Sequence, residues 1–226
     1  MKRLLFLLLL VLLLIVFASS AEAEPIGPPT LQPIVRDDFN EYQNGAVVGQ
    51  GRWADYVHGE NFVVQNSVAF RGRKALYNNS FGDSVVTKAA RHQADGRQTV
   101  YVRTEHRALW GPYIDGNAQF RVTKGSWAGG TDIFAAVTFK RDGNVAYYDV
   151  ANRVYRNFAT YSDNRWTRLE IEWRSSDKTA RYRVGEGMWT NWETFAGAAS
   201  FTDFDHVGFD FYLPRGSGGV YFDTLR

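Results

Sequence analysis

Two glutamates spaced two residues apart, Glu170 and Glu172, have a spacing suited to catalysis. Their neighbours alternate in polarity through residues 167–174, which is typical of a half-buried strand. Positions i and i+2 of a strand share a face and lie about 6.5 to 7 Å apart at the backbone. Retaining glycosidases hold a nucleophile and an acid about 5 to 5.5 Å apart, which such a pair can reach. The alternative is a solvated strand face on which Arg168 and Arg174 neutralise the glutamates.

Aromatic side chains in segments rich in Gly, Asn and Asp form a second set of candidates. They are Trp110, Tyr113, Trp127, Trp189 and Trp192. Sugar rings stack on aromatic faces, while amide, carboxyl and guanidinium groups bind the sugar hydroxyls. The pattern therefore indicates a glycan-binding surface. The alternative is that these loop residues cap the ends of the core.

Other kinds of chemistry have little support in the composition. The four histidines form neither a His-x-His nor a His-Glu-x-x-His motif, and no Gly-x-Ser-x-Gly motif occurs. The absence of cysteine excludes disulfides and thiolate chemistry. With 24 acidic and 26 basic side chains, the charge gives no argument for nucleic acid or an anionic membrane surface.

Short strands must position these candidates. From Trp53 onward the sequence predicts about a dozen strands, separated by turns at roughly eight- to twelve-residue spacing, and no convincing helix. Asp142-Gly143, for example, is a strong hairpin signal. The predicted fold class is all-β, with two antiparallel sheets packed face to face. No second linker divides the chain, so we expect one domain over residues 34–226.

The N-terminal segment is predicted to be a secretory signal. Lys2 and Arg3 precede an apolar run over residues 4–17, and small residues end in Ala21-Glu22-Ala23, which fits an A-x-A cleavage site. We therefore expect a signal peptide over residues 1–23, a Pro-rich linker over 24–33, and a protein that is secreted or held in the cell envelope. The alternative is that the signal segment is retained as an anchor.

Several motifs, in this order, resemble those of bacterial concanavalin A-like lectin/glucanase domains, the laminin-G-like jelly rolls. The motifs occupy residues 37–42, 49–53, 140–143, 164–173 and 219–225. The resemblance implies a single-domain jelly-roll sandwich of two curved sheets, with the first and last strands adjacent. It also implies a glycan-related role, in a family that includes binding modules, hydrolases and lyases.

The catalytic motifs of the family are incomplete here. In the resemblance to laminarinase-like enzymes, Glu170 matches the first catalytic glutamate, Glu172 stands at the intervening aspartate, and Arg174 replaces the second glutamate. The segment from Arg103 to Arg107 looks like the strand of jelly-roll alginate lyases whose arginines hold a uronate carboxylate. The companion histidine and tyrosine motifs of those enzymes are missing, so no general base and acid are matched.

The resemblance also implies one structural calcium ion. Related jelly rolls often carry such an ion. Asp38 lies in the predicted first strand, residues 34–39, and Asp223 lies in the predicted last strand, residues 220–225. Calcium takes six to eight oxygen ligands, so backbone carbonyls would have to complete the site. The alternatives are that both aspartates are solvated, or that Asp223 pairs with Arg36.

The sequence therefore predicts an exported, monomeric β-sandwich protein that binds a polysaccharide or glycoconjugate without cleaving it. The predicted ligand-binding residues are Trp110, Tyr113, Trp127, Trp189, Trp192, Arg103 and Arg107. The second hypothesis is a glycoside hydrolase or polysaccharide lyase. The third is an envelope or surface domain that binds another protein.

Overall fold

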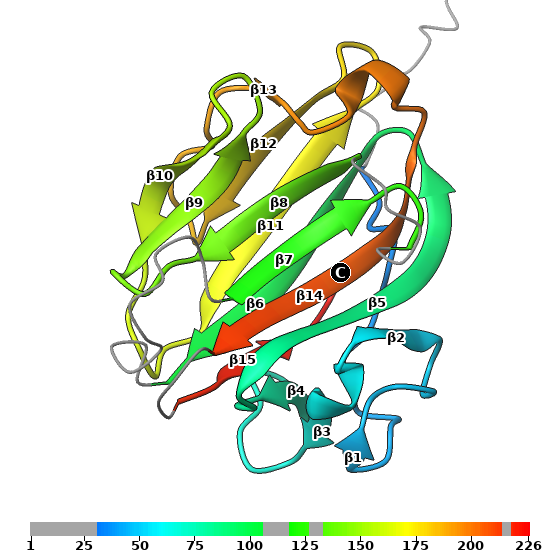
Figure 1. Ribbon diagram of the computed structural model, residues 1–226, viewed down its shortest axis with the longest axis vertical. Coiled ribbons are helices and arrows are strands. Elements are labelled where there is room, and N and C mark those ends of the chain that lie inside the picture. Colours follow the sequence, from blue (N-terminus) through cyan, green and yellow to red (C-terminus); the bar gives the residue numbers. More distant parts are fainter. Residues whose placement is uncertain (1–30, 106–117, 127–132, 214–217) are drawn as a thin grey trace, which may run out of the picture. The chain divides into compact units, whose positions relative to one another are not determined.

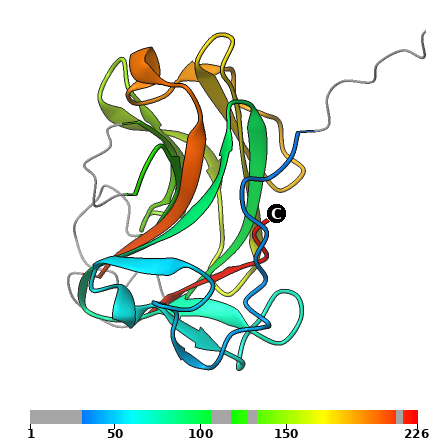
Figure 2. The ribbon, with the colours of Figure 1, turned by 90° about the vertical axis from the view of Figure 1, so that its right-hand side faces the viewer.

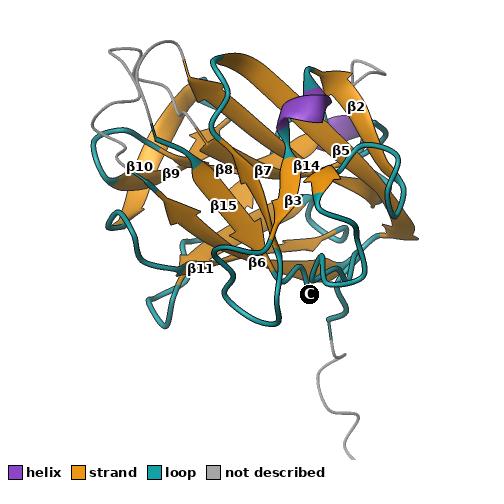
Figure 3. Cartoon of the chain, turned by 90° about the horizontal axis from the view of Figure 1, so that it is seen from below, coloured by secondary structure: helices purple, strands orange, loops and turns teal. Residues whose placement is uncertain are grey.

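The computed structural model describes residues 31–105, 118–126, 133–213 and 218–226. Within these ranges the chain forms two sheets, and its only helical elements are the 3-10 turns η1 (Gly59–Asn61) and η4 (Ala198–Ser200) (Figure 3). Leu31–Arg226 forms one compact unit. No helix in the described part is long and apolar enough to cross a membrane.

The strands pair antiparallel in both sheets, and the two layers face each other (Figure 2). The eight-stranded sheet contains, in spatial order, β1 (Gly45–Ala46), β3 (Val63–Gln65), β4 (Ala75–Asn78), β15 (Val220–Asp223), β6 (Gly96–Thr104), β11 (Thr167–Arg174), β12 (Thr179–Val184) and β13 (Glu193–Thr194). The seven-stranded sheet contains β10 (Val154–Thr160), β9 (Asn144–Asp149), β8 (Phe134–Phe139), β7 (Ala118–Thr123), β14 (Phe204–Leu213), β5 (Gly82–Gln93) and β2 (Trp53–Val57). This architecture confirms the predicted all-β sandwich.

Strand β11 has the predicted alternation. Leu169, Ile171 and Trp173 are fully buried in the core between the sheets. The glutamates face the other way, and β11 lies between β6 and β12. In this register Glu170 is opposite Thr99 and Arg183, and Glu172 is opposite Arg97 and Arg181. The neighbouring strands therefore decide which charges surround the two carboxylates.

Aromatic rings join the two sheets in the core. Phe209 of β14 stacks on Phe222 of β15, with 4.1 Å between ring centroids, and on Trp53 of β2 at 5.4 Å. Because β15 belongs to the eight-stranded sheet and β14 to the seven-stranded sheet, this stack crosses the sandwich. Burial of large aromatic surfaces supplies most of the driving force for packing in a chain that has no cysteine.

The first segment of the domain differs from the strand predicted at residues 34–39. Its only β-bridge joins Asp37 to Leu225. Asp37 Oδ1 accepts the N–H of Phe39 at 3.0 Å, and Asp38 Oδ1 accepts the N–H of Asn40 at 3.1 Å. These side-chain hydrogen bonds turn the backbone and end the extended segment. The bridge nevertheless places the first and last segments side by side, as the resemblance implies.

Strands β5 and β14 are the longest of the seven-stranded sheet, and both bend along their length (Figure 1). They pair over most of β14, from Phe204 to Leu213. Val85, Thr87 and Thr138 lie on the face of this sheet that points away from the core, yet all three are buried. The outer face of the seven-stranded sheet therefore contains positions that are shielded from solvent without belonging to the main core.

Candidate functional site

The outer face of the seven-stranded sheet carries a connected polar network. Asp210 of β14 is opposite Gln119 of β7, which is opposite Thr138 of β8. The Gln119 amide donates to Thr138 Oγ1 at 2.7 Å and to the Tyr155 hydroxyl at 3.0 Å. Arg121 Nε donates to the Gln119 carbonyl oxygen, and Arg121 Nη2 lies 3.7 Å from Asp210 Oδ2. Four strands thus position one continuous group of donors and acceptors.

The carboxyl group of Asp210 has unusual electrostatics. Burial raises its pKa to about 7, the guanidinium of Arg121 opposes the shift, and Asp83 adds to it through its charge and a hydrogen bond. Asp83 lies on β5, beside Tyr212 in the β5–β14 register. At neutral pH the Asp210 carboxyl is therefore divided between a form that donates a hydrogen bond and a form that only accepts. A group of this kind can bind a sugar hydroxyl in either sense, or transfer a proton.

Aromatic rings border this network. Phe134 lies 4.8 Å below the Arg121 guanidinium carbon, measured to the ring centroid. Tyr148 lies 5.9 Å from Phe134 and 5.3 Å from Tyr155, both between ring centroids. The sheet therefore combines a polar group with an aromatic border, which is the composition of a site for a polyhydroxylated ligand.

Sequence reasoning did not identify this site. Val207, Phe209 and Phe211 alternate as expected of a strand, but this pattern gives no role to Asp210 between the last two. A single carboxylate between two core phenylalanines is a weak signal, since outward positions of a half-exposed strand are ordinarily charged. The partners Arg121 and Asp83 come from distant parts of the chain, and only the fold brings them together.

The two glutamates of β11 face a different environment, on the outer face of the eight-stranded sheet. Glu170 accepts from Arg183 Nε at 2.7 Å and lies 3.3 Å from Arg168 Nη2. Glu172 accepts from Arg181 Nη2 at 2.8 Å and also from Arg97. Each carboxylate is thus held by two guanidinium groups; the hypothesis that this pair is not catalytic stays a prediction.

Two of the predicted ligand tryptophans lie over arginines of the same outer face. The ring centroid of Trp189 is 4.5 Å from the guanidinium carbon of Arg183, and that of Trp192 is 3.9 Å from Arg174. Both rings are half-buried. These cation–π contacts give the rings a structural role, so their predicted part in ligand binding stays a prediction. Trp110, Tyr113, Trp127 and Arg107 lie outside the described residues.

Arg103, the remaining predicted ligand residue, belongs to a separate cluster of side-chain contacts on the same sheet. It forms a 3.2 Å ion pair with Glu105 and donates to Asn164 at 3.0 Å. Glu105 also accepts from the Tyr221 hydroxyl at 3.0 Å. Burial raises the pKa of the Tyr221 hydroxyl, and Glu105 adds to the shift, so that hydroxyl stays protonated. Arg103 and the tryptophans of residues 189–192 are thus held by separate sets of contacts.

The predicted calcium ligands Asp38 and Asp223 have other partners. Asp223 is fully buried, and its Oδ2 accepts the backbone N–H groups of Phe70 at 2.7 Å and Arg71 at 3.0 Å. Burial raises the pKa of Asp223, although these N–H groups oppose the shift. Asp38 is exposed and caps its own turn. This donor-rich setting fits a calcium ion poorly; the ion stays a prediction, which thermal unfolding with excess chelator and with millimolar calcium would test.

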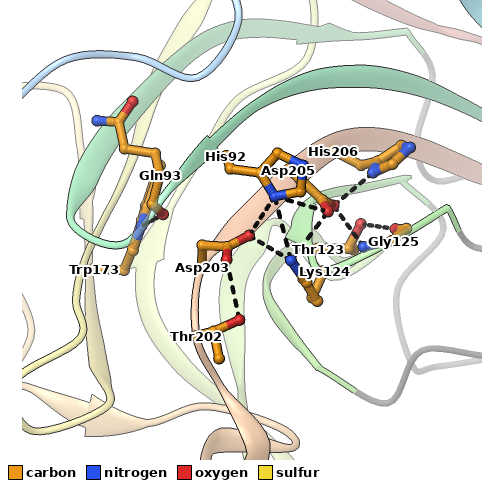
Figure 4. A network of polar contacts seen from close by, with 10 residues as sticks. All are labelled: His92, Gln93, Thr123, Lys124, Gly125, Trp173, Thr202, Asp203, Asp205 and His206. Atoms are coloured by element: carbon orange, nitrogen blue, oxygen red, sulfur yellow. Dashed lines mark hydrogen bonds and ion pairs between the residues drawn. The ribbon is translucent and has the colours of Figure 1, made fainter.

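One group in the described part of the chain has three metal-type ligands within 4.8 Å of one another: His92, Asp203 and Asp205 (Figure 4). Lys124 already lies among them, with its Nζ 2.5 Å from Asp203 Oδ1 and 3.4 Å from Asp205 Oδ2. His206 Nδ1 adds a contact of 2.6 Å to Asp205. Burial raises the pKa of Asp205, but the hydrogen bonds from His206 and Gly125 outweigh it and hold the pKa below its usual value. The lysine ammonium neutralises the carboxylates, so we interpret the group as a structural ion-pair network.

Comparison with known proteins identifies the fold. No family model matches the chain, and no curated protein sequence matches it. A sialidase gives a TM-score of 0.61 at 11% identity, over 87% of this chain and 18% of the sialidase chain, so this chain spans under a fifth of that protein. A carbohydrate esterase from the Shiga toxin-encoding bacteriophage phi24B gives 0.56 at 14% identity, over 86% and 97% of the two chains. The catalytic domain of a glycoside hydrolase family 131 protein from Coprinopsis cinerea gives 0.53 at 11% identity, over 86% and 94%.

These likenesses define the class of fold: the chain has a concanavalin A-like jelly-roll fold, as its motifs imply. At identities of 11–14% they carry no information about individual site residues. The site must therefore be argued from the side chains of this chain.

Proposed function

We propose that this protein binds a polysaccharide or glycoconjugate on the outer face of its seven-stranded sheet. The observation that carries the proposal is the network of Asp210, Arg121 and Gln119 beside the rings of Tyr148 and Tyr155. Its alternating donors and acceptors suit hydroxyl groups, and its rings suit the apolar faces of sugars. Carbohydrate-active proteins among its structural neighbours support the same class of ligand.

Binding without cleavage is the favoured form of the proposal. The strand glutamates Glu170 and Glu172 are each neutralised by two arginines. On the other sheet, Asp83 raises the pKa of Asp210 through its charge and a hydrogen bond, an effect that requires the two carboxyls to lie close together. Glycosidases need their two carboxyls at least about 5 Å apart, so that a nucleophile or a water can act opposite the acid.

A second candidate function, cleavage of such a polymer, is favoured by one observation. The pKa of Asp210, raised to about 7, is suited to a general acid that works near neutral pH. In that case Asp210 protonates the leaving group. A reducing-sugar assay on the full chain and on Asp210→Asn separates the two functions, because only an enzyme releases reducing ends and loses that activity in the variant.

A glycan array with wild-type protein and two matched variants tests the binding proposal. Tyr148 and Tyr77 are both half-buried strand tyrosines, but they lie on the outer faces of opposite sheets. Tyr148→Ala should weaken binding of a neutral glycan by about 1 to 3 kcal/mol, the usual cost of losing an aromatic anchor. Tyr77→Ala should leave it unchanged. Equal loss in both variants, or loss only in Tyr77→Ala, would overturn the location of the site.

We also propose that the chain is exported and acts as a monomer outside the cytoplasm. The proposal is supported by the signal-like sequence of residues 1–23 and by a ligand class that is commonly extracellular. N-terminal sequencing of the protein recovered from its host should give a first residue at position 24. A protein that still carries residues 1–23 would show that the signal segment is retained.

A further inference from the structure

A pocket lies on the opposite side of the sandwich from the Asp210 network, at the outer face of the eight-stranded sheet. Its charged and polar lining is Arg36, Arg97, Thr99, Arg168, Glu170 and Arg226. Arg97 and Thr99 come from β6, while Arg168 and Glu170 come from β11. Arg226 extends this sheet, since its backbone N–H and C=O pair with Thr99 at 3.1 and 2.7 Å. Four distant parts of the sequence thus bring four guanidinium groups to one pocket.

The charge of this pocket is not balanced by its own carboxylate. Glu170 is the one acidic side chain of its lining. It already forms ion pairs with Arg183 at 2.6 Å and with Arg168 at 3.3 Å. The partner of Arg97 is Glu172, which is itself shared with Arg181. Glu186 also pairs with Arg168, at 3.0 Å. These three carboxylates pair with four arginines, Arg97, Arg168, Arg181 and Arg183, so a surplus of positive charge remains.

Arg36 and Arg226 supply that surplus. Both are exposed and bond to neutral groups: Arg36 donates to the side-chain amide oxygen of Gln32 at 3.3 Å, and Arg226 donates to the Tyr101 hydroxyl at 3.2 Å. A guanidinium group can form two parallel hydrogen bonds to a planar or tetrahedral oxyanion. A single hydrogen bond to a neutral oxygen leaves this capacity unused. Both arginines also line a neighbouring pocket with Asp37, Asp38 and Glu41. Among the described residues, however, neither guanidinium group has a side-chain carboxylate within ion-pair distance.

We propose that this pocket binds the carboxylate or sulfate group of an acidic polysaccharide. The chemistry of the lining selects an oxyanion, and the overall charge of +2 gives the chain no general attraction for nucleic acid. Trp189 lies at the border, with its ring centroid 5.2 Å from the Arg97 guanidinium carbon, and supplies an aromatic surface for a neighbouring sugar. The proposal rests on the proposed function only for the class of polymer, because its site is on the opposite sheet.

The test measures binding of the full chain to polygalacturonate, to heparin, to a neutral β-glucan and to a DNA duplex. The double variant Arg36→Gln/Arg226→Gln removes the two uncompensated charges. The control Arg141→Gln/Arg153→Gln removes the same charge from exposed hairpin residues beside β8, β9 and β10. Matching thermal midpoints of the two variants exclude unfolding as the cause of any difference.

Wild-type protein should bind at least one of the two acidic glycans. The Arg36/Arg226 variant should bind it about tenfold more weakly, which corresponds to about 1.4 kcal/mol. The control should stay within about twofold. Binding of the neutral glycan should be unchanged in both, so failure of this proposal is distinguishable from failure at Tyr148. Equal losses in both double variants, no binding of either acidic glycan, or tighter binding of DNA than of both glycans would overturn it.

Discussion

The two outer faces of the sandwich differ in how many opposite charges surround a carboxylate. On the eight-stranded sheet, Glu172 is 5% exposed and lies between Arg97 and Arg181. On the seven-stranded sheet, Asp210 is 23% exposed, its ion pair with Arg121 is 3.7 Å long, and Asp83 brings a second negative charge. Both carboxylates project from the middle of a long strand. The first is fully compensated and stabilises the fold, while the second is under-compensated, which is typical of a functional group.

Removing charge from the compensated face should have the largest effect on stability. Glu172→Gln leaves two guanidinium groups without their counter-ion, and breaking a buried pair costs about 3 to 5 kcal/mol. Because Arg97 and Arg181 are 36% and 27% exposed, solvent screens part of this loss. We expect the free energy of unfolding to fall by about 2 to 3 kcal/mol, measured by urea denaturation at pH 7.

A matched control is available in Glu186. It also pairs with an arginine, Arg168, at 3.0 Å, but it is 86% exposed. Glu186→Gln should change the free energy of unfolding by less than about 0.5 kcal/mol. If Glu172→Gln changed the free energy of unfolding as little, the charge of Glu172 would not be needed to stabilise Arg97 and Arg181. The proposed contrast between the two faces would then be wrong.

Removing the charge of Asp210 should have the opposite effect to removing that of Glu172: it should raise the free energy of unfolding above neutral pH. Its native pKa of about 7 lies above the value of about 3.9 in an unfolded chain. Between these two pH values the native state binds more protons than the unfolded state, so stability falls as the pH rises through this window. Asp210→Asn removes the ionisation. At pH 8 the variant should be more stable than the wild type by about 1 to 2 kcal/mol, after allowance for partial exposure.

Thermal or urea unfolding of both proteins at pH 5 and pH 8 provides the measurement. The stability difference between them should shrink at pH 5, where Asp210 of the wild type is protonated. Two stability curves that run parallel over this range would show that Asp210 has an ordinary pKa. The charge of Asp210 would then be compensated like that of Glu172, and the proposal that the seven-stranded sheet is the functional face would be wrong.

The sequence predicts the compensated face better than the under-compensated one. Alternation from Leu169 to Trp173 sets the outward direction of both glutamates by local geometry alone. Even there, only part of the pairing is local: Arg168 reaches Glu170 as predicted, whereas Arg174 pairs with Asp177. The other arginines come from β6 and β12.

The Asp210 site depends wholly on non-local register. Burial raises its pKa, Arg121 opposes the shift and Asp83 adds to it. Arg121 and Asp83 lie far from Asp210 in the sequence and become its neighbours only through the pairing of β14 with β7 and β5. A pattern of alternating polarity identifies which residues point outward. It does not identify which outward residues of different strands share a row, and that placement decides the chemistry.

The smallest expected effect concerns Trp192, where two interpretations of the eight-stranded face compete. Its ring centroid lies 3.9 Å from the guanidinium carbon of Arg174 and 4.6 Å from that of Arg181. If the ring only packs on these arginines, Trp192→Ala should lower the free energy of unfolding by about 1 kcal/mol, the combined value of such exposed cation–π contacts. Binding of a neutral glycan should then stay within about twofold of the wild type.

Met188→Ala, in the same loop and highly exposed, is the control and should change neither quantity. A loss of tenfold or more in glycan binding by Trp192→Ala, with an unchanged unfolding midpoint, would instead establish the loop tryptophans as ligand residues and move the binding site to this side of the sandwich.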